Sequence, residues 1–211
     1  MKIDIPRISP VLNDKRFTDV FYEEDPILEM CQVTDADFTN ETIHRMRINN
    51  AIIKNSQFNQ TDFSHIDLTD VRFEKCDLSN VNFAKSSIHR VEFVNCKLLG
   101  SEFPESSIRN VTFENSILNL AAFGNAKLEK VIFNDTALKN ADFYDCKFKK
   151  IEFNRCDLDE ANFEQTSLKG IDISSSTFGS LTVSLESLRG CKVSSYQAIQ
   201  FAALIGLIIK D

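Results

Sequence analysis

The stretch that decides the fold is residues 71–100, which read VRFEKCDLSNVNFAKSSIHRVEFVNCKLLG. Every fifth residue in it is apolar, and the same register holds without a slip at 34 consecutive positions from Leu28 to Val193. A helix repeats every 3.6 residues and a strand every 2, so a period of five fits neither. The pattern indicates a solenoid, in which short units each bury one side chain and stack on their neighbours.

A longer period of 20 residues lies inside the short one. Phenylalanine recurs in one series from Phe63 to Phe163 and in a second from Phe73 to Phe153, while the positions between them hold mostly Leu or Ile. Four units therefore make one turn of 20 residues, and like residues stack on like. We predict an all-β solenoid, a four-sided parallel β-helix of about 8.5 coils over residues 26–195, without projecting loops.

The charges sort by the sides of this coil, which we name by the inward residue of residues 81–100. For residues 26–195, the Phe83 face has 7 acidic and 2 basic residues and the Leu98 face beside it has 5 and 2. The Ile88 face has 5 acidic and 10 basic residues, and the Phe93 face has 7 and 5. The Phe83 and Leu98 faces, together called the acidic side, thus carry a net charge of −8 within a chain of −7.

The acidic side is the candidate partner-binding surface, with a plain solvated surface as the alternative. The coiled part is about 41 Å long at ~4.8 Å per coil, and B-DNA of that length carries about 24 charges. The rod therefore matches DNA in sign but not in charge density, and apolar contacts must contribute; the outward Leu99, Ile117 and Leu120 are candidates. The carboxylates proposed to bind are Asp62, Asp77, Glu102, Glu105, Asp142, Asp145, Asp157 and Glu164.

A basic strip on the Ile88 face offers a different function, direct nucleic-acid binding. The strip has no interleaved outward aromatic residues, so this function ranks low. Its members are Arg90, Arg109, Lys127, Lys130, Lys147, Lys149, Lys150 and Lys169.

The six cysteines all lie two residues before a register position, in a slot that otherwise holds Ala, Ser, Thr or Val. They are therefore expected to be small interior residues. No pair has C-x-x-C spacing, so no zinc site is predicted. Coil spacing alone allows a disulfide between Cys76 and Cys96, but the reducing cytoplasm disfavours it. No cofactor motif or catalytic triad is present, and we predict a binding protein rather than an enzyme.

The two ends are expected to cap the solenoid, because terminal coils expose apolar faces and strand edges. Residues 1–25 are expected to fold over the first coil as an N-terminal cap. Ser194 and Gln197 form a potential capping box for a helix over about 195–205, which Gly206 ends, with a short strand at Leu207–Ile209. No apolar stretch is long enough for a membrane span, and no secretory signal is seen, so a cytoplasmic location is expected.

The C-terminal segment 196–211 carries more apolar surface than one coil end can cover. A simple cap is one interpretation, and a homodimer joined through the C-termini is the preferred one. The residues predicted to form the dimer interface are Ile199, Leu204, Leu207, Ile208 and Ile209.

The repeated unit, small–polar–Phe/Leu–polar–polar, resembles that of the pentapeptide-repeat proteins over about four fifths of the chain. Within that family, residues 73–79, 96–100 and the end from Leu188 to Ile209 resemble the Qnr group. The resemblance implies a right-handed coil, a C-terminal homodimer, and a DNA mimic that binds DNA gyrase or topoisomerase IV and protects it from quinolones. The unbroken register resembles the loop-free Gram-positive type. The alternative is a pentapeptide-repeat scaffold or immunity protein with a different protein partner.

Overall fold

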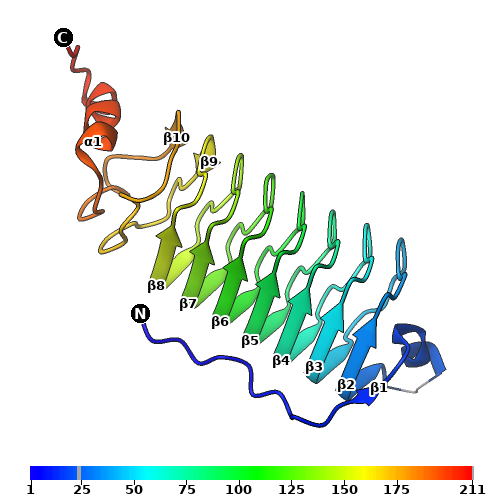
Figure 1. The fold of residues 1–211 in the computed structure, drawn as a ribbon. Helices are drawn as coiled ribbons and strands as arrows, with labels where there is room; N and C mark the ends of the chain where they lie inside the picture. The colour runs from blue at the N-terminus through cyan, green and yellow to red at the C-terminus, as the bar shows by residue number, and fades with distance from the viewer. Residues whose placement is uncertain (23–24, 211) are drawn as a thin grey trace.

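The computed structural model describes residues 1–22 and 25–210. Seven strands of eight residues lie 20 residues apart and pair in parallel, so the chain winds as a parallel β-solenoid (Figure 1). The predicted fold is confirmed. The strands are β2 (Ile27–Thr34), β3 (Arg47–Lys54), β4 (Asp67–Glu74), β5 (Ser87–Val94), β6 (Ser107–Glu114), β7 (Lys127–Asn134) and β8 (Lys147–Asn154).

Each of these strands bends around one corner and supplies the Ile88 and Phe93 faces. The other two faces pair through single bridges with the same offset of 20, such as Asp77 with Lys97 and Asn82 with Glu102. Short strands β9 (Ala161–Asn162) and β10 (Leu181–Thr182) close the series. The ladder from β2 to β8 keeps its register without an inserted residue, so no loop projects from residues 27–154.

The corners explain why every fifth residue is so often Asn, Asp or Gly. From Met30 to Gln165 the non-glycine corner residues have φ between 47° and 62°, the left-handed region that these residues tolerate best. Other corners hold Lys, Arg, Gln, Glu, His or Met, and one corner holds Leu120, whose φ is 61°.

Two columns of stacked phenylalanines fill the core. Consecutive rings from Phe83 to Phe163 have centroids 4.8–5.1 Å apart, and the column from Phe73 to Phe153 has centroids 5.0–5.1 Å apart. The columns meet edge to face across the core, as between Phe103 and Phe113. Both geometries are favourable for aromatic pairs.

In several coils the inner slot, two residues before the Phe or Leu, holds a short side chain that donates a hydrogen bond to the backbone. Ser101 and Ser106 donate from Oγ to the carbonyl oxygens of Leu78 and Phe83, 23 residues earlier. Cys146 and Cys156 make the same bond from Sγ to Phe123 and Phe133, at 3.1 and 3.4 Å. Cysteine thus replaces serine in this slot, as the sequence predicted.

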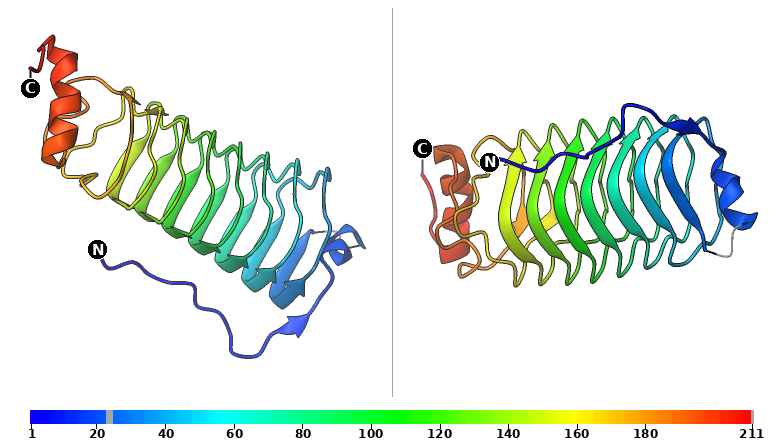
Figure 2. Two further views of the ribbon diagram at one scale, coloured as in Figure 1. Left: turned by 45° about the horizontal axis from the view of Figure 1, so that its top comes forward. Right: turned by 90° about the horizontal axis from the view of Figure 1, so that it is seen from below.

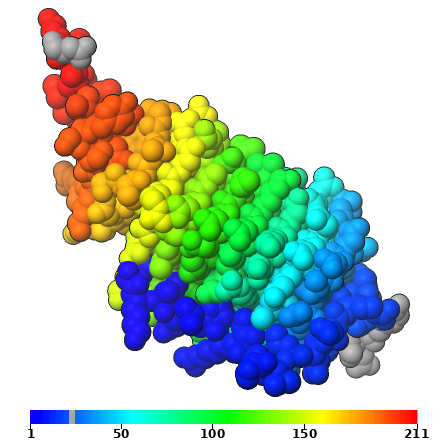
Figure 3. Space-filling model, viewed as in Figure 1, coloured from blue at the N-terminus to red at the C-terminus, as the bar shows by residue number. Residues whose placement is uncertain are grey.

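The N-terminal residues do not all fold over the first coil, and here the sequence prediction was wrong. The 3-10 helix η1 (Phe17–Tyr22) buries Phe17 against Phe38 and Phe58, and β1 (Asn13–Asp14) pairs with the free edge of β2. Residues 1–11, called the strap, instead run along the outside of the coil almost to its far end (Figures 2 and 3). Glu23 and Glu24, inside the predicted 1–25 cap, lie outside the described residues.

The strap is held by side-chain oxygens at the equivalent corner of three coils. The backbone N–H of Ser9 donates to Asn50 Oδ1, that of Arg7 to Asp70 Oδ1, and that of Asp4 to Asn110 Oδ1, at 2.7, 2.9 and 3.3 Å. Three backbone N–H groups of the strap therefore find their hydrogen-bond acceptors on the side of the coil. A cap over the open end of the coil would not place them there.

At the other end, helix α1 (Ser195–Ala202) continues into the 3-10 helix η2 (Ala203–Ile205), and Gly206 ends it with φ 75°. The predicted capping box between Ser194 and Gln197 is formed. The buried Gln197 side chain also donates to the carbonyl oxygens of Ile173 and Ser176, which fixes the helix on the last coil.

The predicted strand at Leu207–Ile209 is not formed in the single chain. A strand needs a neighbour for its backbone groups, and these residues extend away from the coil (Figure 1). Asp211, the last residue of the predicted 196–211 segment, lies outside the described residues.

Candidate functional site

The acidic side is built from ladders of outward residues that repeat every 20 positions. On the Phe83 face the ladder runs Asp62, Asn82, Glu102, Ala122, Asp142 and Asn162, each bridged to the next. On the Leu98 face it runs Gln57, Asp77, Lys97, Ile117, Ala137 and Asp157. Glu105 and Asp145 are corner residues of the Phe83 face, and Glu164 lies on the same face near its C-terminal end.

Lysines on the same side neutralise part of this charge. Lys97 lies 3.1 Å from Asp77, Lys139 lies 3.2 Å from Asp157, and Lys85 lies 3.9 Å from Glu105, all measured from Nζ to a carboxylate oxygen. The candidates without an ion pair to a lysine or arginine, among the described residues, are Asp62, Glu102, Asp142, Asp145 and Glu164.

Amide side chains space the carboxylates of the Phe83 face. Asn82 Nδ2 donates to Asp62 Oδ1 at 3.0 Å, and Asn162 Nδ2 donates to Asp142 Oδ1 at 2.8 Å. Because the ladder alternates carboxylates with neutral residues, like charges are kept two coils apart rather than adjacent.

Hydrogen bonds keep the nearby carboxylates of the Leu98 face ionised. Burial acts most strongly on the pKa of Asp77 and raises it, but donors from Ser79 and Lys97 bring the net pKa below its ordinary value. The N–H groups of Gly179 and Ser180 lower the pKa of Asp159. Both groups are therefore negative at neutral pH.

The basic strip is less available than the sequence suggested. Arg90 pairs with Asp70 through two hydrogen bonds of 2.6 and 2.7 Å, and Lys130 lies 3.3 Å from the strap residue Asp4. Lys149 and Arg109 share Glu129, at 2.7 and 3.7 Å. Half of the strip is thus paired, which further disfavours nucleic-acid binding at this face.

The C-terminal end presents the other candidate surface. An apolar groove of about 410 Å³ is lined by residues of the last coil and of the helix, among them Leu188, Phe201, Ile205 and Leu207. All five predicted interface residues are exposed, from Leu204 at 43% to Ile208 at 88%. Leu207 lines the groove, whereas Ile199, Leu204, Ile208 and Ile209 are exposed on its surroundings.

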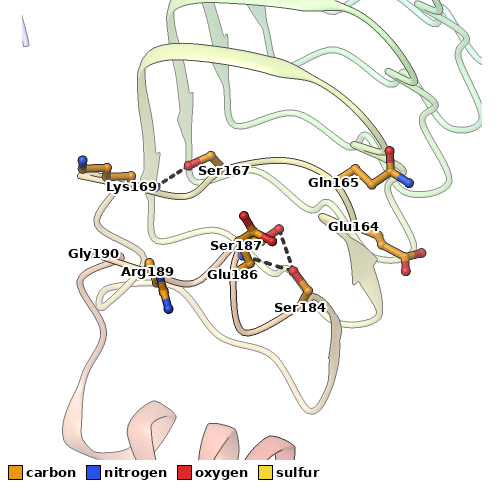
Figure 4. Close-up of a pocket in the computed structure, with 9 residues that line it drawn as sticks. All are labelled: Glu164, Gln165, Ser167, Lys169, Ser184, Glu186, Ser187, Arg189 and Gly190. Carbon is orange, nitrogen blue, oxygen red and sulfur yellow. Dashed lines mark hydrogen bonds between the residues drawn. The ribbon is translucent and has the colours of Figure 1, made fainter.

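A second hollow, of about 700 Å³, lies beside Glu164 at the last coils (Figure 4). Its short polar groups bond to one another, as Ser184 does to Ser187 at 3.1 Å, and the side chains of Lys169 and Glu164 point away from each other (Figure 4). Its polar side chains therefore do not converge on one point as a catalytic set does.

The thiols are not arranged as nucleophiles or ligands. Burial raises the pKa of Cys146 and Cys156 to about 12, and a bond to Cys76 together with burial raises that of Cys96. Among residues 1–22 and 25–210, no group of three His, Cys, Asp or Glu side chains could hold a metal ion. No helix in the same residues is long and apolar enough to cross a membrane.

Sequence reasoning missed two features that bear on these surfaces. The anchors of the strap, Asn50, Asp70 and Asn110, looked like ordinary corner residues, because nothing in the five-residue pattern marks what lies outside the coil. The strain at Leu120 was visible only as a leucine at a corner that holds Asn, Gln, Gly or Glu in the other coils.

The ladder of 20-residue coils defines a protein of the pentapeptide-repeat class. Residues 86–163 match the family model of the pentapeptide repeat region, and residues 66–103 match that of pentapeptide repeats in eight copies. Residues 66–163 are therefore a pentapeptide-repeat region. No curated protein matches its sequence.

Several solved structures share the fold. A trypsin-treated variant of QnrB1, described as a plasmid-mediated fluoroquinolone resistance protein, matches with a TM-score of 0.55 and 21% identity over 85% of this chain and 100% of that one. HetL from Nostoc sp. strain PCC 7120, described as involved in heterocyst differentiation regulation, matches with a TM-score of 0.60 and 14% identity over 87% and 91%. At these identities the likeness concerns the fold.

Proposed function

We propose that this chain is a Qnr-like DNA mimic that binds a type II topoisomerase, DNA gyrase or topoisomerase IV, and protects it from quinolones. The observation that carries the proposal is the acidic side, a straight surface with a majority of unpaired carboxylates along a rod whose fold matches all of QnrB1. A DNA-binding surface of an enzyme is basic and elongated, so a rod with one anionic side is complementary to it.

The proposal gives the acidic side a modest electrostatic role. Its net charge is −8 and three of its carboxylates are paired with lysines. We therefore expect binding that weakens with salt, because exposed charges are screened within about 8 Å at physiological ionic strength. The affinity of this chain for the enzyme should fall less steeply with salt than the affinity of DNA for the same enzyme.

A homodimer joined at the C-terminal ends belongs to the same proposal. The supporting observation is the exposed apolar groove beside α1, together with a tail at residues 207–209 that pairs with no strand among the described residues. A dimer of this kind doubles the length of the rod and presents two acidic sides to a two-fold symmetric enzyme.

The experiment is DNA supercoiling by purified gyrase, and decatenation by topoisomerase IV, in the presence of ciprofloxacin. We expect added protein to restore activity in at least one assay. A variant with Glu102, Asp142 and Asp145 changed to Asn or Gln should protect less. Failure of the wild-type chain to restore either activity at any concentration would contradict the proposal.

The second candidate function is a scaffold or immunity protein with a different protein partner. The observation that favours it is that HetL, with another described role, matches the fold with a TM-score of 0.60, no lower than that of QnrB1. Affinity capture that returns one stoichiometric partner and no topoisomerase would favour this function.

A further inference from the structure

Two coils of the acidic side carry no charge: residues 116–125, in the middle of the rod, and residues 176–185, at its C-terminal end. Along residues 116–125 the outward positions of the Leu98 and Phe83 faces hold neutral residues, whereas the coils on either side carry carboxylates. We call this coil the neutral band. Its outward residues are Ile117, Asn119, Leu120, Ala122, Gly124 and Asn125.

The neutral band also holds the exposed large apolar side chains of the middle of the rod, between Met30 and Leu185, which are themselves exposed near its two ends. Within residues 31–184, all of which the structure describes, the large hydrophobic side chains that are exposed are Ile117, at 45%, and Leu120, at 60%. They lie on one face of a single coil, next to the outward Leu99 of the preceding coil. The corner residue of the preceding coil is Gly100, whose φ is 65°.

The backbone of Leu120 is unfavourable for the residue that occupies it. Leu120 is a corner residue with φ 61°, while Asn40, Asn80 and Asn140 occupy the equivalent corners with φ of 54–59°. Leucine has no side-chain group that eases the left-handed conformation, whereas asparagine tolerates it. An exposed leucine held in this conformation gains little from packing, so the fold does not account for it.

Carboxylates flank the band along the axis of the rod. Ala122 is bridged to Glu102 on one side and to Asp142 on the other. Neither carboxylate is ion-paired within the described residues. On the Leu98 face, which carries Ile117 and Leu120, the flanking charged residues are Lys97 and Lys139, and they are paired with Asp77 and Asp157. The apolar centre thus adjoins two unpaired carboxylates on the Phe83 face, as an interface anchor adjoins its polar rim.

From these observations we infer that Leu120, supported by Ile117, is the apolar anchor through which the acidic side engages its partner. The partner chemistry is a basic protein surface that offers an apolar pocket between lysine or arginine side chains, which pair with Glu102 and Asp142. The inference rests on the proposed function, because the partner is taken to be the DNA-binding surface of a topoisomerase. Duplex DNA offers no such pocket to an acidic rod.

The test is the variant Leu120→Asn, which removes the apolar side chain and installs the residue that this corner prefers. We expect affinity for immobilised gyrase or topoisomerase IV to fall at least tenfold, while the melting temperature stays equal or rises. Gln60→Asn, at an equivalent corner three coils away, is the matched control and should change neither quantity.

The salt dependence of the affinity distinguishes the apolar contribution of Leu120 from the electrostatic contribution of Glu102. The loss of affinity caused by Leu120→Asn should be the same at 0.1 and 0.5 M salt, because the contact that the variant removes is apolar. The loss caused by Glu102→Gln should shrink at 0.5 M, because the charge is screened.

The outcomes are distinguishable. Wild-type affinity in Leu120→Asn would overturn the anchor and leave the proposed function standing. A wild-type chain that binds neither enzyme overturns the proposed function and the anchor with it. A lowered melting temperature in Leu120→Asn would also overturn the inference, because leucine would then be serving the fold.

Discussion

At the scale of single residues, position within the repeat decides what each side chain does. An inward Phe lies in a stack with rings about 5 Å above and below it, as Phe123 does between Phe103 and Phe143. The outward residue beside it is solvent-facing. Two neighbouring residues therefore differ completely in their tolerance of charge.

Phe123→Asp is expected to abolish folding of the coil, because it places an unpaired carboxylate in the core and removes a ring worth about 3–5 kcal/mol on truncation. Ala122→Asp, one residue away on the outer surface, is the matched control and should keep the β-sheet signal. Circular dichroism and thermal unfolding compare the two. A Phe123→Asp protein that melts like the wild type would contradict the coil assignment.

Asp70 binds the strap to the coil through its carboxylate. The contribution of this carboxylate to the free energy of unfolding therefore depends on pH. The Arg90 guanidinium and the Arg7 N–H hold its pKa below the ordinary value, against the effect of burial. A carboxyl whose pKa is lowered on folding stabilises above its unfolded pKa of about 4, and this contribution disappears as pH falls through the folded pKa.

Asp70→Asn should therefore lower the free energy of unfolding by about 1–2 kcal/mol at pH 7, and the difference from wild type should shrink below pH 4. Urea unfolding at pH 7, 5 and 3 measures it. Asp67→Asn on the same face, which has no ion pair within the described residues, is the control. A difference that stays constant down to pH 3 would mean that the charge of Asp70 is not responsible.

At the scale of elements, the strap and helix α1 act on opposite ends of the rod by different means. Helix α1 is fixed on the last coil, where Gln197 donates to two carbonyl groups and Gln200 donates to that of Phe178. The strap is fixed at several coils in turn, from Asn50 to Asn110. It therefore links coils that are otherwise joined only to their nearest neighbours.

Replacing residues 2–11 by a Gly/Ser segment of the same length should leave the solenoid folded but less stable. The expected loss is about 1–3 kcal/mol, because the three backbone hydrogen bonds of the strap contribute about 1 kcal/mol each and the regained chain entropy offsets part of their loss. Hydrogen exchange should rise along the corner formed by Asn50, Asp70 and Asn110. Unchanged stability and exchange would show that the strap is not held in solution.

At the scale of the whole molecule, the two candidate surfaces are separate: the acidic side runs along the rod and the apolar groove lies at its C-terminal end. A dimer through the groove leaves both acidic sides free. Partner binding and self-association can therefore be altered independently.

Leu204→Glu or Ile208→Glu should give a monomer, because a carboxylate in an apolar interface loses its hydration. Lys210→Glu changes charge without removing apolar surface and is the control. Light scattering at several concentrations measures the mass. A wild-type chain that is monomeric at all concentrations would rule out the C-terminal homodimer.

The five-residue register and its grouping by twenty determined the coil, its phenylalanine columns, the cysteine slots and the side on which each charge lies, because in a solenoid every contact repeats at a fixed sequence separation. The helix caps followed for the same local reason, since Ser194 and Gln197 lie three residues apart.

Only the tertiary structure decided where the strap runs, which basic residues are paired, and that residues 207–209 have no partner strand among the described residues. The contacts of the strap join residues 41 to 151 positions apart outside the register, as between Ser9 and Asn50 and between Met1 and Glu152. The five-residue register does not predict such contacts, because it specifies only which residues point into the coil and which lie at its corners. What lies against the outer surface depends on the path of the chain in space.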